Sequence, residues 1–179
     1  MKRILVTYGG ISAALTVAFA IVSLILMNRR VVNFDTGAVV GYAGMTIALS
    51  MVFFGIKAFR DNHQNGKVTF WKGVQVGMLI TLISSLAYAT TWEIYYRNAP
   101  GVMAEHLNKY TEASLNEMRE GGASQDEIDK AAKRMAEMME MYKNPFIRYG
   151  MTLAEILPVG MIIVLIGAGI LRKKEVVPA

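Results

Sequence analysis

The sequence predicts an all-α membrane protein with four transmembrane helices and an extramembrane helical hairpin between the third and the fourth helix. Three observations carry this prediction. Hydrophobic residues make up 54% of the 179 residues, which is more than a soluble domain usually contains. They gather in four blocks of 20 to 24 residues, each with no more than one charged residue. A long polar segment, residues 97–146, separates the last two blocks.

Each block is long enough to cross a bilayer as a helix. A helix rises about 1.5 Å per residue and the hydrocarbon core is about 30 Å thick, so about 20 apolar residues span it. Buried helices of a soluble protein would instead show polar residues at every third or fourth position. Trp71 and Trp92 flank the third block, as indole rings do where a span meets the two interfaces. The blocks cover residues 4–27, 37–56, 73–92 and 149–171.

The first block also has features of a signal peptide. Lys2 and Arg3 precede the apolar run, and Ala18-Phe19-Ala20 resembles a cleavage site. Apolar residues continue as far as Met27, however, and the run is longer than the core of a signal peptide. We therefore expect a retained first span.

Basic residues in the short loops predict the orientation, because cytoplasmic loops are enriched in Lys and Arg. With a cytoplasmic N-terminus, nine basic residues lie inside and only Arg29 and Arg30 lie in the short outer loop. Both termini should be cytoplasmic, and residues 97–146 should be periplasmic or extracellular. The basic residues that give the net charge of +5 then act as topology signals and contact lipid headgroups, and they do not indicate nucleic-acid binding. The inner set is Lys2, Arg3, Lys57, Arg60, Lys67, Lys72, Arg172, Lys173 and Lys174.

The polar segment, residues 97–146, predicts a hairpin of two helices. It separates residues 1–96, which hold the first three spans, from residues 147–179, which hold the fourth. We expect the first helix over residues 101–120, and Gly121-Gly122 should break it. Ser124 and Glu127 form the pattern of a capping box at the start of the second helix. Apolar residues recur every three or four positions in both helices. They are Met103, Leu107, Tyr110 and Met118 in the first, and Ile128, Ala132, Met135, Met139 and Tyr142 in the second.

Short motifs in a fixed order give the chain a family resemblance. Together with the four-span layout, they resemble a bacterial family designated domain of unknown function 4199. The resemblance covers nearly the whole chain and implies a small protein of the bacterial cytoplasmic (inner) membrane. It implies no catalytic or binding residue. The motifs are Tyr8-Gly9, Gly41-Tyr42-Ala43-Gly44-Met45, Phe59-Arg60-Asp61, residues 66–73, residues 140–145, Glu155 and Pro158-Val159-Gly160.

Composition and motifs exclude several kinds of chemistry. The chain has no cysteine, which excludes disulfides, thiolate metal sites and thiol catalysis. It has no nucleophile elbow, zinc-protease motif or phosphate-binding glycine loop. His63 and His106 fall on opposite sides of the expected membrane and cannot share a metal. We expect no catalytic residue, metal or cofactor.

Glu155 is the one charged residue inside the expected spans, about 10 Å below the outer interface. A carboxylate at that depth costs about 2.5–3.5 kcal/mol on insertion scales, so it should face the bundle interior. Tyr42, Thr46, Tyr88 and Thr91 fall at similar depth, and we expect a polar contact with at least one of them. Two roles stay open: a hydrogen-bonded packing element, or an outward-facing site for a proton, a cation or a polar ligand.

Two smaller features concern packing. Gly73 and Gly77 form a small-xxx-small motif that lets helices approach closely, within the bundle or between copies. Glu93 and Arg97 are four residues apart at the end of the third span and should form a surface ion pair.

The leading interpretation is a non-enzymatic scaffold or interaction protein with an external hairpin. Its expected partners are membrane lipids and, through the hairpin, a second copy or another membrane protein. The alternative is a small oligomeric transporter or channel with an outward-facing polar site at Glu155. The inner half of the fourth span, residues 159–171, is uniformly apolar, which favours an outer pocket over a pore.

Overall fold

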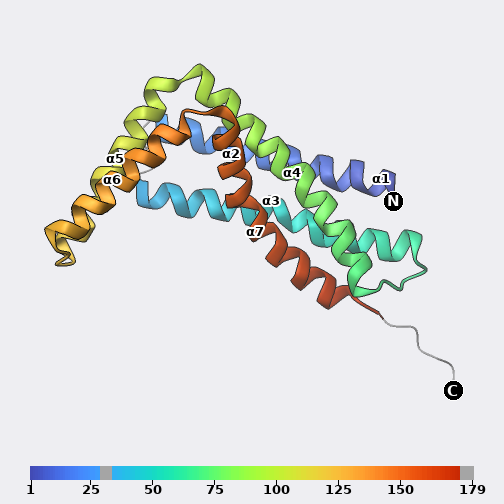
Figure 1. The fold of residues 1–179 in the computed structure, drawn as a ribbon. Helices are drawn as coiled ribbons and strands as arrows, with labels where there is room; N and C mark the ends of the chain where they lie inside the picture. The colour runs from blue at the N-terminus through green and yellow to red at the C-terminus, as the bar shows by residue number, and fades with distance from the viewer. Residues whose placement is uncertain (29–33, 174–179) are drawn as a thin grey trace. The chain divides into compact units, whose positions relative to one another are not determined.

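The computed structural model describes residues 1–28 and 34–173, and the regular structure in these ranges is helical (Figure 1). Arg29 and Arg30 of the expected outer loop and Lys174 of the expected inner set lie outside the described residues. The helices are α1 (Lys2–Ile4), the π-helical η1 (Leu5–Gly9), α2 (Gly10–Asn28), α3 (Phe34–His63), α4 (Phe70–Asn98), α5 (Pro100–Glu120), α6 (Gln125–Tyr142) and α7 (Pro145–Leu171).

Four helical stretches are long and apolar enough to cross a membrane, which confirms the predicted all-α class with four candidate spans. They are Lys2–Leu26, Val39–His63, Phe70–Asn98 and Pro145–Leu171. Each extends beyond the apolar block that predicted it, because charged and polar residues continue the helix past the hydrocarbon-length core. Lys2–Leu26 is helical throughout, with π-helical geometry over Leu5–Gly9.

The chain forms two compact units. The first comprises residues 1–91 and 152–179, and the second comprises residues 92–151. The second unit therefore contains α5 and α6 together with the end of α4 and the start of α7. The hairpin segment and the ends of the two flanking helices belong to one folded body.

The core of the first unit lies between α3, α4 and α7. Its fully buried apolar side chains are Leu49, Val52, Ile56, Val76, Ile80, Ile156 and Val164. Ser12 of α2 is also buried and donates a hydrogen bond of 2.9 Å to the carbonyl oxygen of Ala48 in α3. This bond joins the first two spans, whose buried polar groups need a partner within the protein.

A tight turn and a short backbone bridge close one end of the first unit. Asn65 and Gly66 have positive φ angles of 48° and 79°, as their sequence predicts. The backbone N–H of Lys173 donates to the carbonyl oxygen of Val68 over 3.1 Å. The end of α7 is thereby attached to the loop between α3 and α4.

The second unit contains the two helices that the polar segment predicts. The chain turns through Gly121 and Gly122, and Gly122 has a φ of 80° that favours glycine. The capping box is present, with Ser124 and Glu127 bonded reciprocally. These hydrogen bonds from Ser124 hold the pKa of the Glu127 carboxyl below its usual value, so the charged form caps α6.

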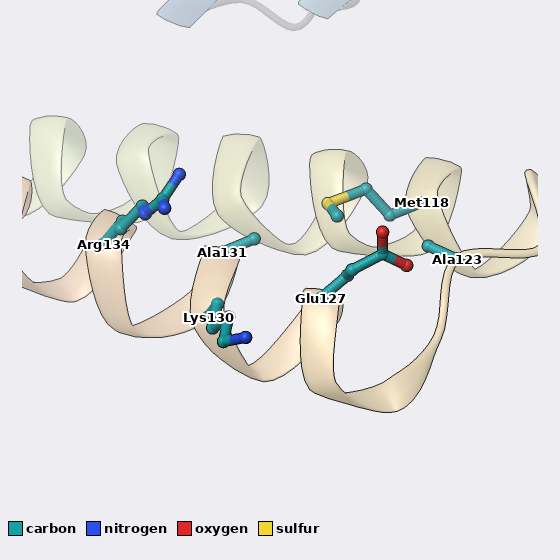
Figure 2. Close-up of a pocket in the computed structure, with 6 residues that line it drawn as sticks. All are labelled: Met118, Ala123, Glu127, Lys130, Ala131 and Arg134. Atoms are coloured by element: carbon teal, nitrogen blue, oxygen red, sulfur yellow. The ribbon is translucent and has the colours of Figure 1, made fainter.

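Side chains of α5 and α6 meet along a seam. Thr111 of α5 lies 3.8 Å from the sulfur of Met139 in α6. Nearer the turn, a shallow groove of about 300 Å³ runs between the helices. Figure 2 shows Met118 and the Glu127 carboxylate pointing toward each other across it, with Arg134 farther along α6. The lining residues are Met118, Ala123, Glu127, Lys130, Ala131 and Arg134.

The stripe predicted on α6 is its least exposed side, but the stripe predicted on α5 needs a correction. Ile128 is buried, and Ala132, Met135, Met139 and Tyr142 are half-buried. On α5, Leu107 and Met118 are half-buried, whereas Tyr110 is 46% exposed and Thr111 and Leu115 lie in the seam. A helix covered by a single partner buries only a narrow stripe, and Tyr110 falls to one side of it. The side chain of Met103 lies outside what the structure describes.

Replacing Met135 by aspartate should open the hairpin, because it places an unpaired charge in the seam. Limited proteolysis of the purified protein should then cut within residues 101–142 several times faster than in the wild type. Glu137→Lys is the matched control, since Glu137 is exposed on the same helix. Equal protection of Met135→Asp and wild type would show that the seam does not hold the two helices together.

Candidate functional site

Glu155 does not occupy the interior site that the sequence predicts. Its side chain is exposed on α7, whereas its neighbour Ile156 is fully buried. Within the described residues, Glu155 makes no hydrogen bond or ion pair. The depth of a residue along a span is fixed by the sequence, but the side of the helix that faces the bundle is fixed by packing, and here packing turns Ile156 inward.

The four expected partners of Glu155 are placed elsewhere. Tyr42 is 50% exposed, and Thr46 donates to the Tyr42 carbonyl oxygen over 2.8 Å. Thr91 donates to the carbonyl oxygen of Ala87 over 2.9 Å. Tyr88 packs against the apolar core. A hydroxyl bonded to the carbonyl four residues earlier is already satisfied by its own helix, so it does not draw in a carboxyl group from another span.

Gly73 and Gly77 lie against α7. A Cβ atom on Gly73 would lie 3.1 Å from the Cβ of Ala168, and one on Gly77 would lie 2.9 Å from Cγ1 of Val164. Glycine therefore permits the close approach of α4 and α7 within one chain.

The most highly connected polar cluster lies in the second unit, around Arg148. Its side chain is only 3% exposed and that of its partner Glu93 is 14% exposed. Arg148 Nε and Nη2 donate to the two Glu93 carboxylate oxygens over 2.8 Å each. Arg97 Nε donates to Glu93 as well, over 2.8 Å, as the spacing of these residues predicts. The Glu93 carboxylate thus binds one buried and one exposed guanidinium.

Backbone and aromatic groups complete the surroundings of Arg148. Its Nη1 donates to the carbonyl oxygens of Tyr142 and Lys143, over 2.8 and 3.4 Å. The guanidinium carbon lies 3.6 Å from the centre of the Tyr96 ring, a cation–π geometry. Trp92 Nε1 donates to the Tyr142 hydroxyl. We call the cluster of Arg148 with the groups that contact it, which are the Glu93 carboxylate, the Tyr96 ring and the carbonyl oxygens of Tyr142 and Lys143, the Arg148 clamp.

The Arg148 clamp joins the two ends of the hairpin segment. Glu93 and Tyr96 are at the end of α4, Tyr142 is the last residue of α6, and Arg148 is in the first turns of α7. A bidentate Arg–carboxylate pair is directional and strong when water is excluded. The clamp therefore fixes how the chain leaves α4 and returns to α7, across 55 residues of sequence.

Sequence reasoning missed Arg148, although a signal was present. Arg148 is the last charge before the fourth apolar block, and Glu93 is the first charge after the third. Opposite charges at the adjoining ends of two spans would have predicted an ion pair. Next to the clamp, a hydrogen bond and the negative charge of Glu140 raise the pKa of Lys143 above its usual value, so this lysine stays charged.

A model of one protein family matches residues 7–173. The chain belongs to the DUF4199 family. The description of that family is "Protein of unknown function", which agrees with the resemblance in the short motifs. Neither curated proteins nor solved structures give a match.

Membership of the DUF4199 family assigns no function to any residue of this chain, so the function has to be argued from the site itself. Among the described residues there is no group of three or more His, Cys, Asp or Glu side chains that could hold a metal ion. The Arg148 clamp is built from satisfied donors and acceptors, an arrangement suited to holding structure.

Proposed function

We propose that this DUF4199 protein is a non-enzymatic interaction protein of the bacterial cytoplasmic membrane, with the α5–α6 hairpin as its external docking element. The Arg148 clamp is the observation that carries the proposal. An ion pair with a buried guanidinium and four hydrogen bonds, at the two ends of a hairpin, holds the hairpin in one orientation relative to the ends of its flanking spans. A pre-oriented binding surface loses less entropy when a partner binds.

The hairpin carries an open apolar side that supports this role. Tyr110, Met138 and Met141 are 46%, 49% and 49% exposed. Thr111 contacts Met139, so these three side chains lie at one level of the antiparallel pair, and helical periodicity puts them on one side of the seam. Exposed methionines adapt to the shape of a partner. The partner that we propose is a second membrane protein with an apolar segment outside the bilayer.

Five hydroxyl groups of the spans support a non-enzymatic role, because their hydrogen bonds serve helix packing. Each of these five donates to a carbonyl oxygen of its own helix, so its proton is already engaged in a structural hydrogen bond. The residues are Thr16, Thr46, Ser84, Ser85 and Thr91.

The distribution of basic residues supports an external hairpin. The start of α1 contacts α3, and Ile4 shares a core cluster with Phe59 near the end of α3. Lys173 is bridged to Val68 just before α4. Eight of the nine basic residues of the inner set belong to these segments of the first unit, and a cytoplasmic location of this end follows from the positive-inside rule.

Reporter fusions test this orientation. Alkaline phosphatase, which is active only outside the cytoplasm, should be active when inserted after Gly122 and inactive when fused after Ala179. A fluorescent protein that matures only in the cytoplasm should give the opposite pattern at the same two positions. Active phosphatase at Ala179 together with inactive phosphatase at Gly122 would reverse the proposed orientation.

Site-specific photo-crosslinking in cells tests the docking role. A photoreactive phenylalanine at Met138 should give a discrete adduct that mass spectrometry identifies as a second membrane protein. The same group at Glu137, which is exposed on another side of α6, should not. Arg148→Met should lower the Met138 adduct several-fold at equal protein level, because the docking side loses its orientation. Equal adduct yields at Met138 and Glu137 would contradict the proposal. So would a Met138 adduct whose yield Arg148→Met leaves unchanged.

A further inference from the structure

The exposed side of α7 carries one carboxyl group in an otherwise apolar stripe. Ile162 and Ile166 are 59% and 57% exposed, and they follow Glu155 by seven and eleven residues. This spacing places all three on one side of a helix. The core-facing side carries the fully buried Ile156 and Val164, and Val164 lies opposite Glu155.

An unpartnered carboxyl group on this surface is costly. A polar group in hydrocarbon without a hydrogen-bond partner costs several kcal/mol, and ionisable residues in spans nearly always face protein or water. Glu155 has no hydrogen-bond or ion-pair partner among the described residues, and lipid tails provide none. A polar group of a neighbouring protein molecule at the same depth would remove this cost.

We propose that the partner is Glu155 of a second copy, in a symmetric dimer formed by the Glu155–Ile162–Ile166 stripes of two α7 helices. Two copies inserted with the same topology place Glu155 at the same depth, so a two-fold axis along the membrane normal brings the two carboxyl groups together. A carboxyl group that carries its proton has a donor and an acceptor and complements an identical group.

The residues around the stripe allow two helices to approach. Ala154 has a small exposed side chain, and a Cβ atom on Gly169 would meet nothing within 4 Å. Small residues are enriched where membrane helices pack closely. This inference concerns the membrane-embedded side of α7 and does not rest on the docking role of the hairpin.

Disulfide cross-linking tests the dimer directly, because the chain has no cysteine of its own. Single-cysteine variants Ile162→Cys and Ile166→Cys, in liposomes at high lipid-to-protein ratio, should form dimers on oxidation. Ile47→Cys is the matched control, since Ile47 is 54% exposed on α3, and it should remain monomeric. Dimers of Ile47→Cys in equal yield, or no dimers of either α7 variant, would overturn the proposed interface.

Substitutions of Glu155 in the Ile162→Cys background test the role of the carboxyl group. Glu155→Gln should preserve the cross-link, because an amide also donates and accepts. Glu155→Leu should lower the association constant about 3- to 30-fold, the range that measured polar contacts between membrane helices imply. Circular dichroism should show unchanged helix content in both variants. If Glu155→Leu formed dimers as well as the wild type, the proposal would be overturned. The Glu155 carboxyl group would then be hydrogen-bonded to water from the outer surface.

Discussion

Arg148→Met should destabilise the second unit by about 1.5 to 3 kcal/mol, because the Glu93 carboxylate loses its buried partner and keeps only the exposed Arg97. The side chains of Arg148 and Glu93 are 3% and 14% exposed, so water replaces few of the lost hydrogen bonds. The Tyr142 and Lys143 carbonyl oxygens lose a donor as well. Hydrogen exchange of the amides in residues 92–151, with the protein in nanodiscs, measures the change as a loss of protection.

Two controls separate the buried pair from general charge effects. Arg97 donates to the same carboxylate but is 69% exposed, so Arg97→Met should cost no more than about 1 kcal/mol. The double variant Arg148→Met with Glu93→Gln should recover much of the loss, because the carboxylate charge is removed together with its buried partner. Equal effects of the Arg148 and Arg97 substitutions would show that the clamp contributes no more than a surface ion pair.

The elements of this fold could be predicted from the sequence because each depends on local pattern. Block length defines the four spans. The capping box of Ser124 and Glu127 and the turn at Asn65-Gly66 depend on three or four consecutive residues, and both are present. The α6 stripe follows from 3.6-residue periodicity alone. In each case the determining pattern lies within one continuous segment of the chain.

The site could not be predicted in the same way, because it depends on which side of each helix packs inward. Sequence position gives the depth of Glu155 but not its direction, and the buried Ile156 beside it settles that direction. Tyr110 is exposed for the same reason. Arg148 reaches Glu93 across 55 residues, a separation at which no periodic pattern links the two. Only opposite charges at adjoining span ends pointed to the pair.

Gly77→Leu should destabilise the first unit, because α4 and α7 leave no room for a side chain at this position. A Cβ atom there would lie 2.9 Å from Val164 and 3.0 Å from Ile56. Both neighbours are fully buried, so neither can swing into solvent or lipid. Overpacking of this kind costs about 1 to 3 kcal/mol for extra methylenes in a well-packed core, and leucine adds four carbon atoms.

The measurement is the thermal unfolding midpoint of the purified protein in detergent, followed by circular dichroism. Gly77→Leu should lower the midpoint by several degrees, because a loss of about 1 kcal/mol shifts a domain of this size by about 2 to 4 °C. Gly41→Leu is the matched control, since a Cβ atom on Gly41 of α3 would meet nothing within 4 Å. Its midpoint should stay near that of the wild type, because leucine also forms helix more readily than glycine. If both variants unfolded at the wild-type temperature, the contact of Gly77 with Val164 would not limit how closely α4 and α7 pack.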